Sequence, residues 1–149
     1  MRNSLKAFLI PVGLAALLVG ASFSCTAADL PAVQHTVNNT FITGGIGLDE
    51  STAIKGAMKD WPLSVLFVQK DGAQAEYVAN VRVKVSDHKG HTAIATESQG
   101  PYMLANVQPG AYRVEATLDN KTLQQDVEIK QGKPVKLTFL WPAQAGAVQ

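Results

Sequence analysis

From residue 61 onward, hydrophobic residues recur at every second position in several successive stretches. In the clearest of them, Tyr112, Val114, Ala116 and Leu118 alternate with polar side chains. This period of two is typical of a half-buried strand in an antiparallel sheet. The stretches that predict strands are residues 61–68, 77–85, 91–97, 100–107, 112–118, 123–129 and 135–141.

Turn sequences separate these stretches at the spacing expected of a small all-β domain. They are Lys70–Ala73, Asp87–Gly90, Asp119–Lys121 and Gln131–Pro134. Residues 61–68 are apolar on both faces, so we expect that strand to be central or covered on both sides. The pattern predicts a seven-stranded antiparallel β-sandwich over residues 61–142, followed by a tail at 143–149.

The residues before the sandwich change character twice. Residues 29–43 are polar and small and predict an extended lead-in, with one possible edge strand at Thr40–Thr43. Residues 44–60 begin with a glycine-rich turn and then place apolar residues at helical spacing. They predict one short helix from about Glu50 to Lys59, capped by Asp49, with its apolar stripe on the sheet.

Residues 1–28 have the order of a secretory signal peptide: a basic start, an apolar run, then small residues. The apolar run is short for a membrane span, and cleavage is expected after Ala27 or Ala28. An alternative is a lipoprotein acylated at Cys25. That signal needs a Leu-like residue three positions earlier, where this chain has Ser22. The expected location is periplasmic or secreted.

Charge and cysteine content narrow the function classes. The whole chain of 149 residues carries a formal net charge of +1. Removing residues 1–28 takes away two basic and no acidic side chains, which leaves 11 basic and 12 acidic ones. So balanced a surface argues against nucleic acid or an anionic membrane as partner. Without Cys25 the mature chain has no disulfide, thiol nucleophile or thiolate metal ligand.

Three segments together resemble the carboxypeptidase regulatory-like domain: Val81–His91, Gly100–Tyr102 and Val107–Val114. The family pattern is a strand, an Asp-x-x-Gly turn, a Gly-x-Tyr element and a Leu-x-Pro-Gly-x-Tyr-x-Val motif, with Val107 here in place of the Leu. The resemblance implies a transthyretin-like (prealbumin-like) sandwich and a non-catalytic accessory or binding module. Gly44–Glu50 is also similar to a leader of small uncharacterised exported proteobacterial proteins with this domain.

The residues of the Val107–Val114 motif can also be explained by their own conformational preferences. Pro109 and Gly110 supply a fixed and then a permissive φ, as a tight turn requires. Tyr112 is expected to bury its ring and to send its hydroxyl to a backbone partner, as a corner tyrosine does in sandwiches.

Aromatic residues are the main candidates for ligand contact. Trp61, Tyr102 and Trp141 could form a sugar-binding platform, because related sandwiches bind glycans. Trp141 falls in an inward row and is expected in the core. Tyr102 stands beside Gly100-Pro101 at a loop and is the best candidate for exposure. The predicted ligand-binding residues are therefore Tyr102 and Trp61.

Metal and phosphate sites receive less support. His88 and His91 lie three residues apart around a turn, and a metal would need further ligands such as Asp87 and Glu97. We therefore expect His88 and His91 to be solvated and to bind no metal, and we expect no cofactor. His35 is also expected to be exposed. Gly44–Gly47 could cradle a phosphate, but the dinucleotide fingerprint is incomplete and Asp49 and Glu50 would repel an anion, so we expect a tight turn before a helix.

Catalytic patterns are also sparse. No serine has a Gly-x-Ser-x-Gly context, and Asp49 and Glu50, as neighbours on a helix, point in different directions. The chain also lacks the Tyr-Arg-Gly-Ser ending of transthyretin-like hydroxyisourate hydrolases. The sequence therefore predicts a non-enzymatic binding or interaction module, whose partner is an unknown envelope protein or glycan. The alternatives are a small hydrolase, a carbohydrate-binding protein on the same sandwich, and a structural protein of the envelope.

Overall fold

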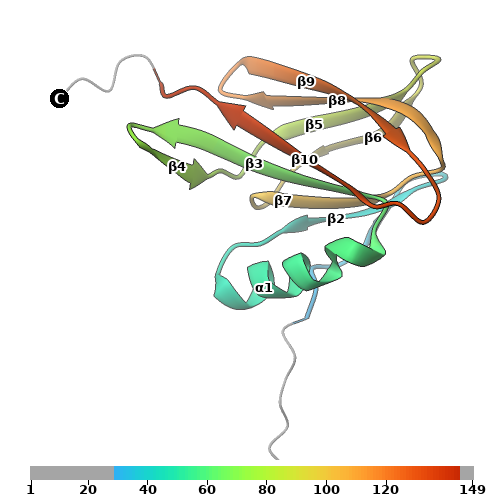
Figure 1. The fold of residues 1–149 in the computed structure, drawn as a ribbon, viewed down its shortest axis with the longest axis horizontal. Helices are drawn as coiled ribbons and strands as arrows, with labels where there is room; N and C mark the ends of the chain where they lie inside the picture. The colour runs from blue at the N-terminus through green and yellow to red at the C-terminus, as the bar shows by residue number, and fades with distance from the viewer. Residues whose placement is uncertain (1–28, 145–149) are drawn as a thin grey trace, which may run out of the picture.

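The computed structural model describes residues 29–144 (Figure 1), so the predicted signal peptide, its cleavage site and Cys25 lie outside the described residues. Within 29–144 the chain forms ten strands, one α-helix and one 3-10 turn. In chain order these are β1 (Gln34–His35), β2 (Thr40–Gly44), α1 (Leu48–Ala57), η1 (Met58–Asp60), β3 (Leu63–Asp71), β4 (Gln74–Tyr77), β5 (Arg82–Asp87), β6 (Thr92–Glu97), β7 (Tyr102–Asn106), β8 (Gly110–Leu118), β9 (Lys121–Ile129) and β10 (Val135–Trp141).

The strands form two sheets packed face to face, with the helix on the outside of one of them (Figure 1). The larger sheet has the order β1-β2-β7-β3-β10, and β4 pairs with the distal half of β3. The smaller sheet has the order β6-β5-β8-β9. A β-sandwich is therefore the architecture of the described residues.

The main core lies between the sheets and comes from the predicted alternation. Along β8, Val114, Ala116 and Leu118 point inward and are buried, and Tyr112 is half-buried in the same row. Phe67, Phe139 and Trp141 stack on one another opposite them, with ring centroids 6.1–6.3 Å apart. Burying a side chain of this size stabilises the fold by about 1.5–3 kcal/mol.

A second, smaller core lies between α1 and the outer face of the larger sheet. Ile54 of the helix is fully buried there against Ile42, Tyr102 and Leu104. This cover explains why β3 and its neighbours are apolar on both faces, as the sequence predicted for residues 61–68. The helix thus makes the larger sheet the middle of three layers.

The helix begins differently from the prediction. Its N-cap is Gly47, with φ 87°, and Asp49 lies within the first turn, so the assignment of Asp49 as cap was wrong. The Glu50 carboxylate turns back and accepts a 2.6 Å hydrogen bond from the backbone N–H of Gly45. That bond fixes the glycine-rich turn, and the positive φ of Gly47 lets the chain enter the helix two residues earlier than predicted.

The prediction of seven antiparallel strands was wrong in two respects. Residues 61–142, for which seven strands were predicted, contain eight of the ten strands, and β10 pairs with β3 in parallel, from Val135 opposite Leu63 to Trp141 opposite Gln69. The connection after β9 carries the chain from the smaller sheet to the larger one, so β10 enters beside the start of β3. The strand at Thr40–Gly44 is present, but it pairs on both sides and is mostly buried instead of lying at an edge.

Residues 77–85 were expected to form one strand and instead divide between the sheets. Asn80, with φ 58°, donates its N–H to the carbonyl of Ser98 at 2.7 Å, and the chain crosses there from β4 to β5. Tyr77 consequently leaves the inward row and is 61% exposed. Val81, Val83 and Val85 remain buried as predicted.

Side chains close the sandwich where the two sheets meet beside β9 and β10. The Gln125 amide donates to the carbonyl of Thr138 at 2.7 Å, and the Trp141 indole donates to the carbonyl of Lys121 at 2.9 Å. These bonds satisfy edge carbonyls that would otherwise be open to other strands. Within residues 29–144, no helix has the length and apolar character needed to cross a membrane.

Candidate functional site

Several connections meet at one end of the sandwich, where β3 and β10 begin and β7 and β9 end. The turn between β7 and β8 forms the centre of this end. Pro109 and Gly110 make the turn, and Gly110 has a φ of 153°. The Tyr112 hydroxyl donates a 2.7 Å hydrogen bond to the carbonyl of Gln108, which confirms the predicted corner tyrosine. Burial raises the pKa of Tyr112, and the nearby Asp87 carboxylate adds to the increase.

A groove of about 500 Å³ runs across this end, between the approach to β3, the β7–β8 turn and the β9–β10 connection. We call it the end groove. Its lining residues are Lys59, Asp60, Trp61, Pro62, Asn106, Val107, Gln108, Pro109, Ile129, Lys130, Gln131, Gly132, Lys133 and Pro134. They come from three segments far apart in the sequence, which the two sheets hold in place.

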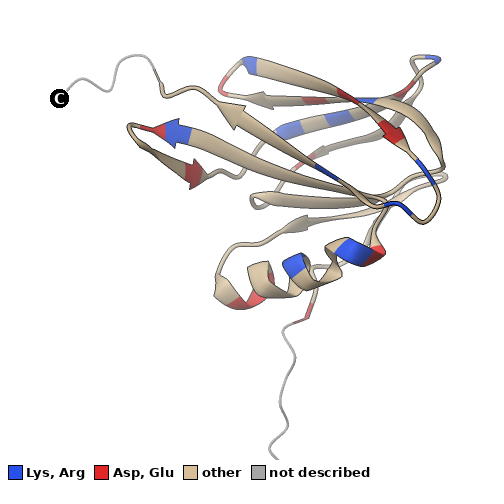
Figure 2. Ribbon diagram, in the orientation of Figure 1, with Lys and Arg blue, Asp and Glu red and all other residues tan. Residues whose placement is uncertain are grey.

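The end groove is basic. It contains three lysines and one acid, Asp60, and that acid is paired with Lys59 at 2.9 Å. Lys130 and Lys133, on either side of the β9–β10 turn, are exposed and supply the excess positive charge. Figure 2 shows basic positions, in blue, along the connection between β9 and β10. The local field therefore favours an anionic ligand.

Trp61, a predicted ligand-binding residue, lines this groove. It is half-buried, because part of its side chain packs against the small core beneath α1. Since the backbone leaves η1 there and continues extended into β3, the ring is held between a helix and a sheet. The aromatic side chain is thus fixed in place beside the lysines.

The other predicted aromatic contacts do not join Trp61. Tyr102 is 2% exposed, so its prediction as an exposed residue was wrong, because α1 and the glycine-rich turn cover it. Burial and the neighbouring Tyr77 raise the pKa of Tyr102 to about 12. Trp141 lies in the main core, as expected. The three residues therefore form no common platform.

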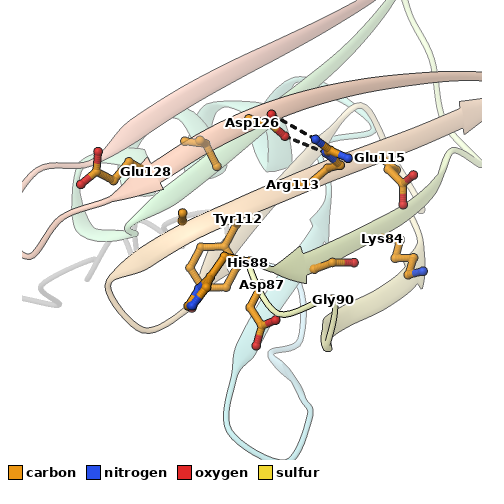
Figure 3. Close-up of a pocket in the computed structure, with 12 residues that line it drawn as sticks. Lys84, Asp87, His88, Gly90, Tyr112, Arg113, Glu115, Asp126 and Glu128 are labelled. Carbon is orange, nitrogen blue, oxygen red and sulfur yellow. Dashed lines mark hydrogen bonds and ion pairs between the residues drawn. The ribbon is translucent and has the colours of Figure 1, made fainter.

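A second concavity, of about 680 Å³, lies over the open face of the smaller sheet, and we call it the sheet depression (Figure 3). Its floor is a mixture of opposite charges. Arg113 bonds Asp126 through two hydrogen bonds of 2.8 and 3.3 Å, which raises the pKa of Arg113 and lowers that of Asp126. Lys84 stands directly across from Glu115. These cross-strand pairs neutralise much of the depression from within.

His88 and Asp87 also line the sheet depression, whereas His91 does not. The Asp87 carboxylate accepts 2.9 Å hydrogen bonds from the backbone N–H groups of Lys89 and His91, and it lies 3.4 Å from the His91 ring. Burial opposes ionisation of Asp87, but these donors outweigh it and lower its pKa. Asp87 is therefore already engaged in holding the turn, and Figure 3 shows it pointing away from Arg113 and Asp126.

The metal ligands that the sequence offered are not brought together. Glu97 lies at the far end of β6, beside Arg82, about 15–20 Å along the strand from the Asp87–Gly90 turn. In the described part of the chain, no three His, Cys, Asp or Glu side chains are grouped closely enough to hold a metal ion. His88 and His91 are exposed, and so is His35.

One hydrogen bond argues against both the phosphate cradle considered at Gly44–Gly47 and the catalytic carboxylate pair considered at Asp49 and Glu50. Glu50 occupies the N–H of Gly45, so the glycine-rich turn binds the chain's own carboxylate. The same bond turns Glu50 away from any joint action with Asp49.

The sequence did not single out Lys130, Lys133, Asn106 or Gln108 as site residues. The only local signal was the lysine spacing around the Gln131–Pro134 turn. Nothing in the sequence placed these lysines near Trp61, which precedes them by about 70 positions.

Comparisons with known proteins give a fold-level picture only. No family model matches the chain, and no curated protein matches it. The crystal structure of GBS52, the minor pilin of the gram-positive pathogen Streptococcus agalactiae, is 17% identical, with a TM-score of 0.45 over 55% of this chain and 45% of that one. The Bacillus anthracis TIE protein is 13% identical, with a TM-score of 0.32 over 55% of this chain and 16% of that one.

The chain thus covers less than half the length of either solved chain. The fold assignment comes from the two packed sheets themselves. The resemblance to carboxypeptidase regulatory-like domains stays a prediction.

Proposed function

We propose that this chain is an exported, non-catalytic binding module of the cell envelope and that it binds its partner in the end groove. The observation that carries the proposal is the meeting of Trp61, Lys130 and Lys133 in one concave site. A rigid aromatic surface beside mobile charged donors is a common composition for a recognition site. Export is inferred from the pattern of residues 1–28, with residues 29–149 as the mature chain.

The binding role is better supported than the hydrolase alternative. Hydrolysis by a side-chain nucleophile needs a base within hydrogen-bond reach of the nucleophile and an acid that orients the base. The closest histidine–carboxylate contact here is His91 with Asp87, and that histidine is 77% exposed and outside the sheet depression. Asp87 meanwhile serves the backbone of its own turn.

The test is retention of envelope material by the mature chain. Immobilised residues 29–149 are incubated with solubilised envelope and, separately, with cytosol, and the retained proteins and glycans are identified. The double variant K130A/K133A should lose the retained envelope component. The matched control K55A/K121A removes the same charge from exposed lysines outside the groove and should keep it.

Two results would contradict the proposal. One is retention that both double variants leave unchanged, since the end groove would then not be the site. The other is ester or glycoside turnover by the purified chain that disappears in H91A, because this would support the hydrolase instead.

A further inference from the structure

Taking the proposed function as its basis, the structure assigns a ligand class to the end groove: we propose that it binds an acidic polysaccharide, a chain of sugars bearing carboxylates. Three features support this assignment. They are the unbalanced lysines, the amide side chains that extend the groove, and the paired backbone at its centre.

The lysines set the sign of the ligand. Lys59 is compensated by Asp60, whereas Lys130 and Lys133 have no ion-pair partner among the described residues. The hydrogen bond between the N–H of Lys133 and the carbonyl of Lys130, 3.2 Å long, closes the turn that carries both side chains. Two ammonium groups are therefore carried by one tight turn, so the same ligand can meet both.

The groove does not end at the β7–β8 turn. A second hollow of about 250 Å³ lies on the other side of that turn and shares Asn106, Val107 and Gln108 with the end groove. It continues to the β1–β2 turn, where Asn38 and Asn39 line it. The two hollows form a track across the end of the sandwich, which fits an extended ligand of several units.

The chemistry of the track favours sugars. Amide side chains both donate and accept hydrogen bonds, as hydroxyl-rich ligands require, and Asn38, Asn106, Gln108 and Gln131 provide four of them, whereas the Asn39 amide donates to the carbonyl of Ala93. An apolar ring such as that of Trp61 suits the C–H face of a sugar.

An extended peptide is the competing ligand, because peptides that bind β-domains commonly add a strand to an open sheet edge. The edge strand β1 reaches the second hollow through His35. At the centre of the track, however, the backbone is paired: Val135 donates to the carbonyl of Pro62 at 2.9 Å, and the carbonyl of Gln108 accepts from Tyr112. Recognition there uses side chains, which suits carboxylates and hydroxyls better than a peptide backbone.

The test compares three soluble probes by isothermal titration calorimetry with residues 29–149 at low salt: a hexamer of galacturonic acid, its methyl ester, and hexaglutamate. We expect the acid hexamer to bind and its methyl ester to bind at least about tenfold more weakly. K130A/K133A should weaken acid binding by roughly tenfold, and K55A/K121A by less than twofold.

A charge-only variant avoids any question of folding. Gln108→Glu keeps the side-chain size and leaves the backbone bond to Tyr112, so it should weaken binding of the acid hexamer several-fold. Gln99→Glu, an exposed residue that lines neither hollow, is its control. Both variants should melt as the wild type does.

The outcomes separate the ligand class from the proposed function. Equal binding of acid and ester, or tighter binding of hexaglutamate, overturns the acidic-glycan assignment. If no probe binds while K130A/K133A still abolishes retention of an envelope component, the ligand class is wrong and the proposed function stands. If retention of the envelope component is also unchanged in K130A/K133A, both the ligand class and the proposed function are wrong.

Discussion

The hydroxyl of Tyr112 and the carbonyl of Gln108 are joined by a 2.7 Å hydrogen bond that ties the start of β8 to the turn before it. Tyr112 belongs to the sheet depression and Gln108 to the end groove. One bond therefore braces the wall between the sheet depression and the end groove. It connects a residue of the sandwich core to the position of a proposed ligand contact.

Tyr112→Phe removes this bond and keeps the ring in the core. We expect a loss of about 1 kcal/mol in the free energy of unfolding, measured by urea denaturation. Gln108→Ala is the matched control, because the tyrosine bonds the backbone carbonyl and the side chain is exposed. Equal destabilisation by both variants would contradict the assigned role of the bond.

Gly100 and Gly56 give a pair of glycine-to-alanine changes with opposite expected signs. A Cβ on Gly100 would overlap the backbone carbonyl of Gly44, and neither segment is a flexible side chain that could give way. Gly100→Ala should therefore destabilise the fold by about 2–4 kcal/mol. Gly56 lies in α1 with nothing within 4 Å of its would-be Cβ, so Gly56→Ala should stabilise by about 0.5–1 kcal/mol. Thermal melts of the two variants would show whether the signs differ.

Ile54 is the residue through which α1 docks onto the larger sheet. It is fully buried, and Ile54→Ala would leave a cavity beside Ile42 and Leu104, costing about 2–4 kcal/mol. The neighbouring Lys55→Ala, on the exposed side of the helix, should change stability by less than about 0.5 kcal/mol. Similar unfolding midpoints for the two variants would mean that the helix is not packed as described.

We expect the stability of the fold to fall at low pH, because protonation of Asp126 removes its ion pair with Arg113. The hydrogen bonds from Arg113 lower the pKa of Asp126 in the folded state. Its contribution to the free energy of unfolding is therefore present above the ordinary aspartate pKa of about 3.9 and is lost as the pH falls through the lower pKa of the folded state. The melting temperature of wild type should exceed that of Asp126→Asn at pH 6, and the difference should shrink toward pH 2. Glu128→Gln, which removes a carboxylate of the same strand that is not bonded to Arg113, is the control. A constant offset for Asp126→Asn across this range would contradict the linkage.

The motif Val107–Val114 shows how far local sequence can reach. Pro109 and Gly110 restrict the turn by their own backbone preferences, and Tyr112 follows at the spacing that returns its hydroxyl to Gln108. All of these contacts lie within five positions, so the prediction succeeded. The same holds for the inward row of β8, which needs only the two-residue period.

The burial of Tyr102 and the exposure of Tyr77 could not be predicted from local sequence. Both have the alternation of a strand, but whether a strand face meets solvent depends on what another part of the chain lays over it. The helix and the glycine-rich turn cover Tyr102, and the crossing at Asn80 leaves Tyr77 outside. Neither event leaves a signal in the neighbouring residues.

The sequence by itself determined the periodic elements, the turns between them and the all-β class, because backbone preferences and side-chain alternation act over a few residues. Only the tertiary structure decided the parallel pairing of β10 with β3, the division of 77–85 between two sheets, and the meeting of Trp61 with Lys130 and Lys133. These depend on which distant segments bury their apolar faces together. The candidate site inherits that dependence, since its residues come close only after the sheets have packed.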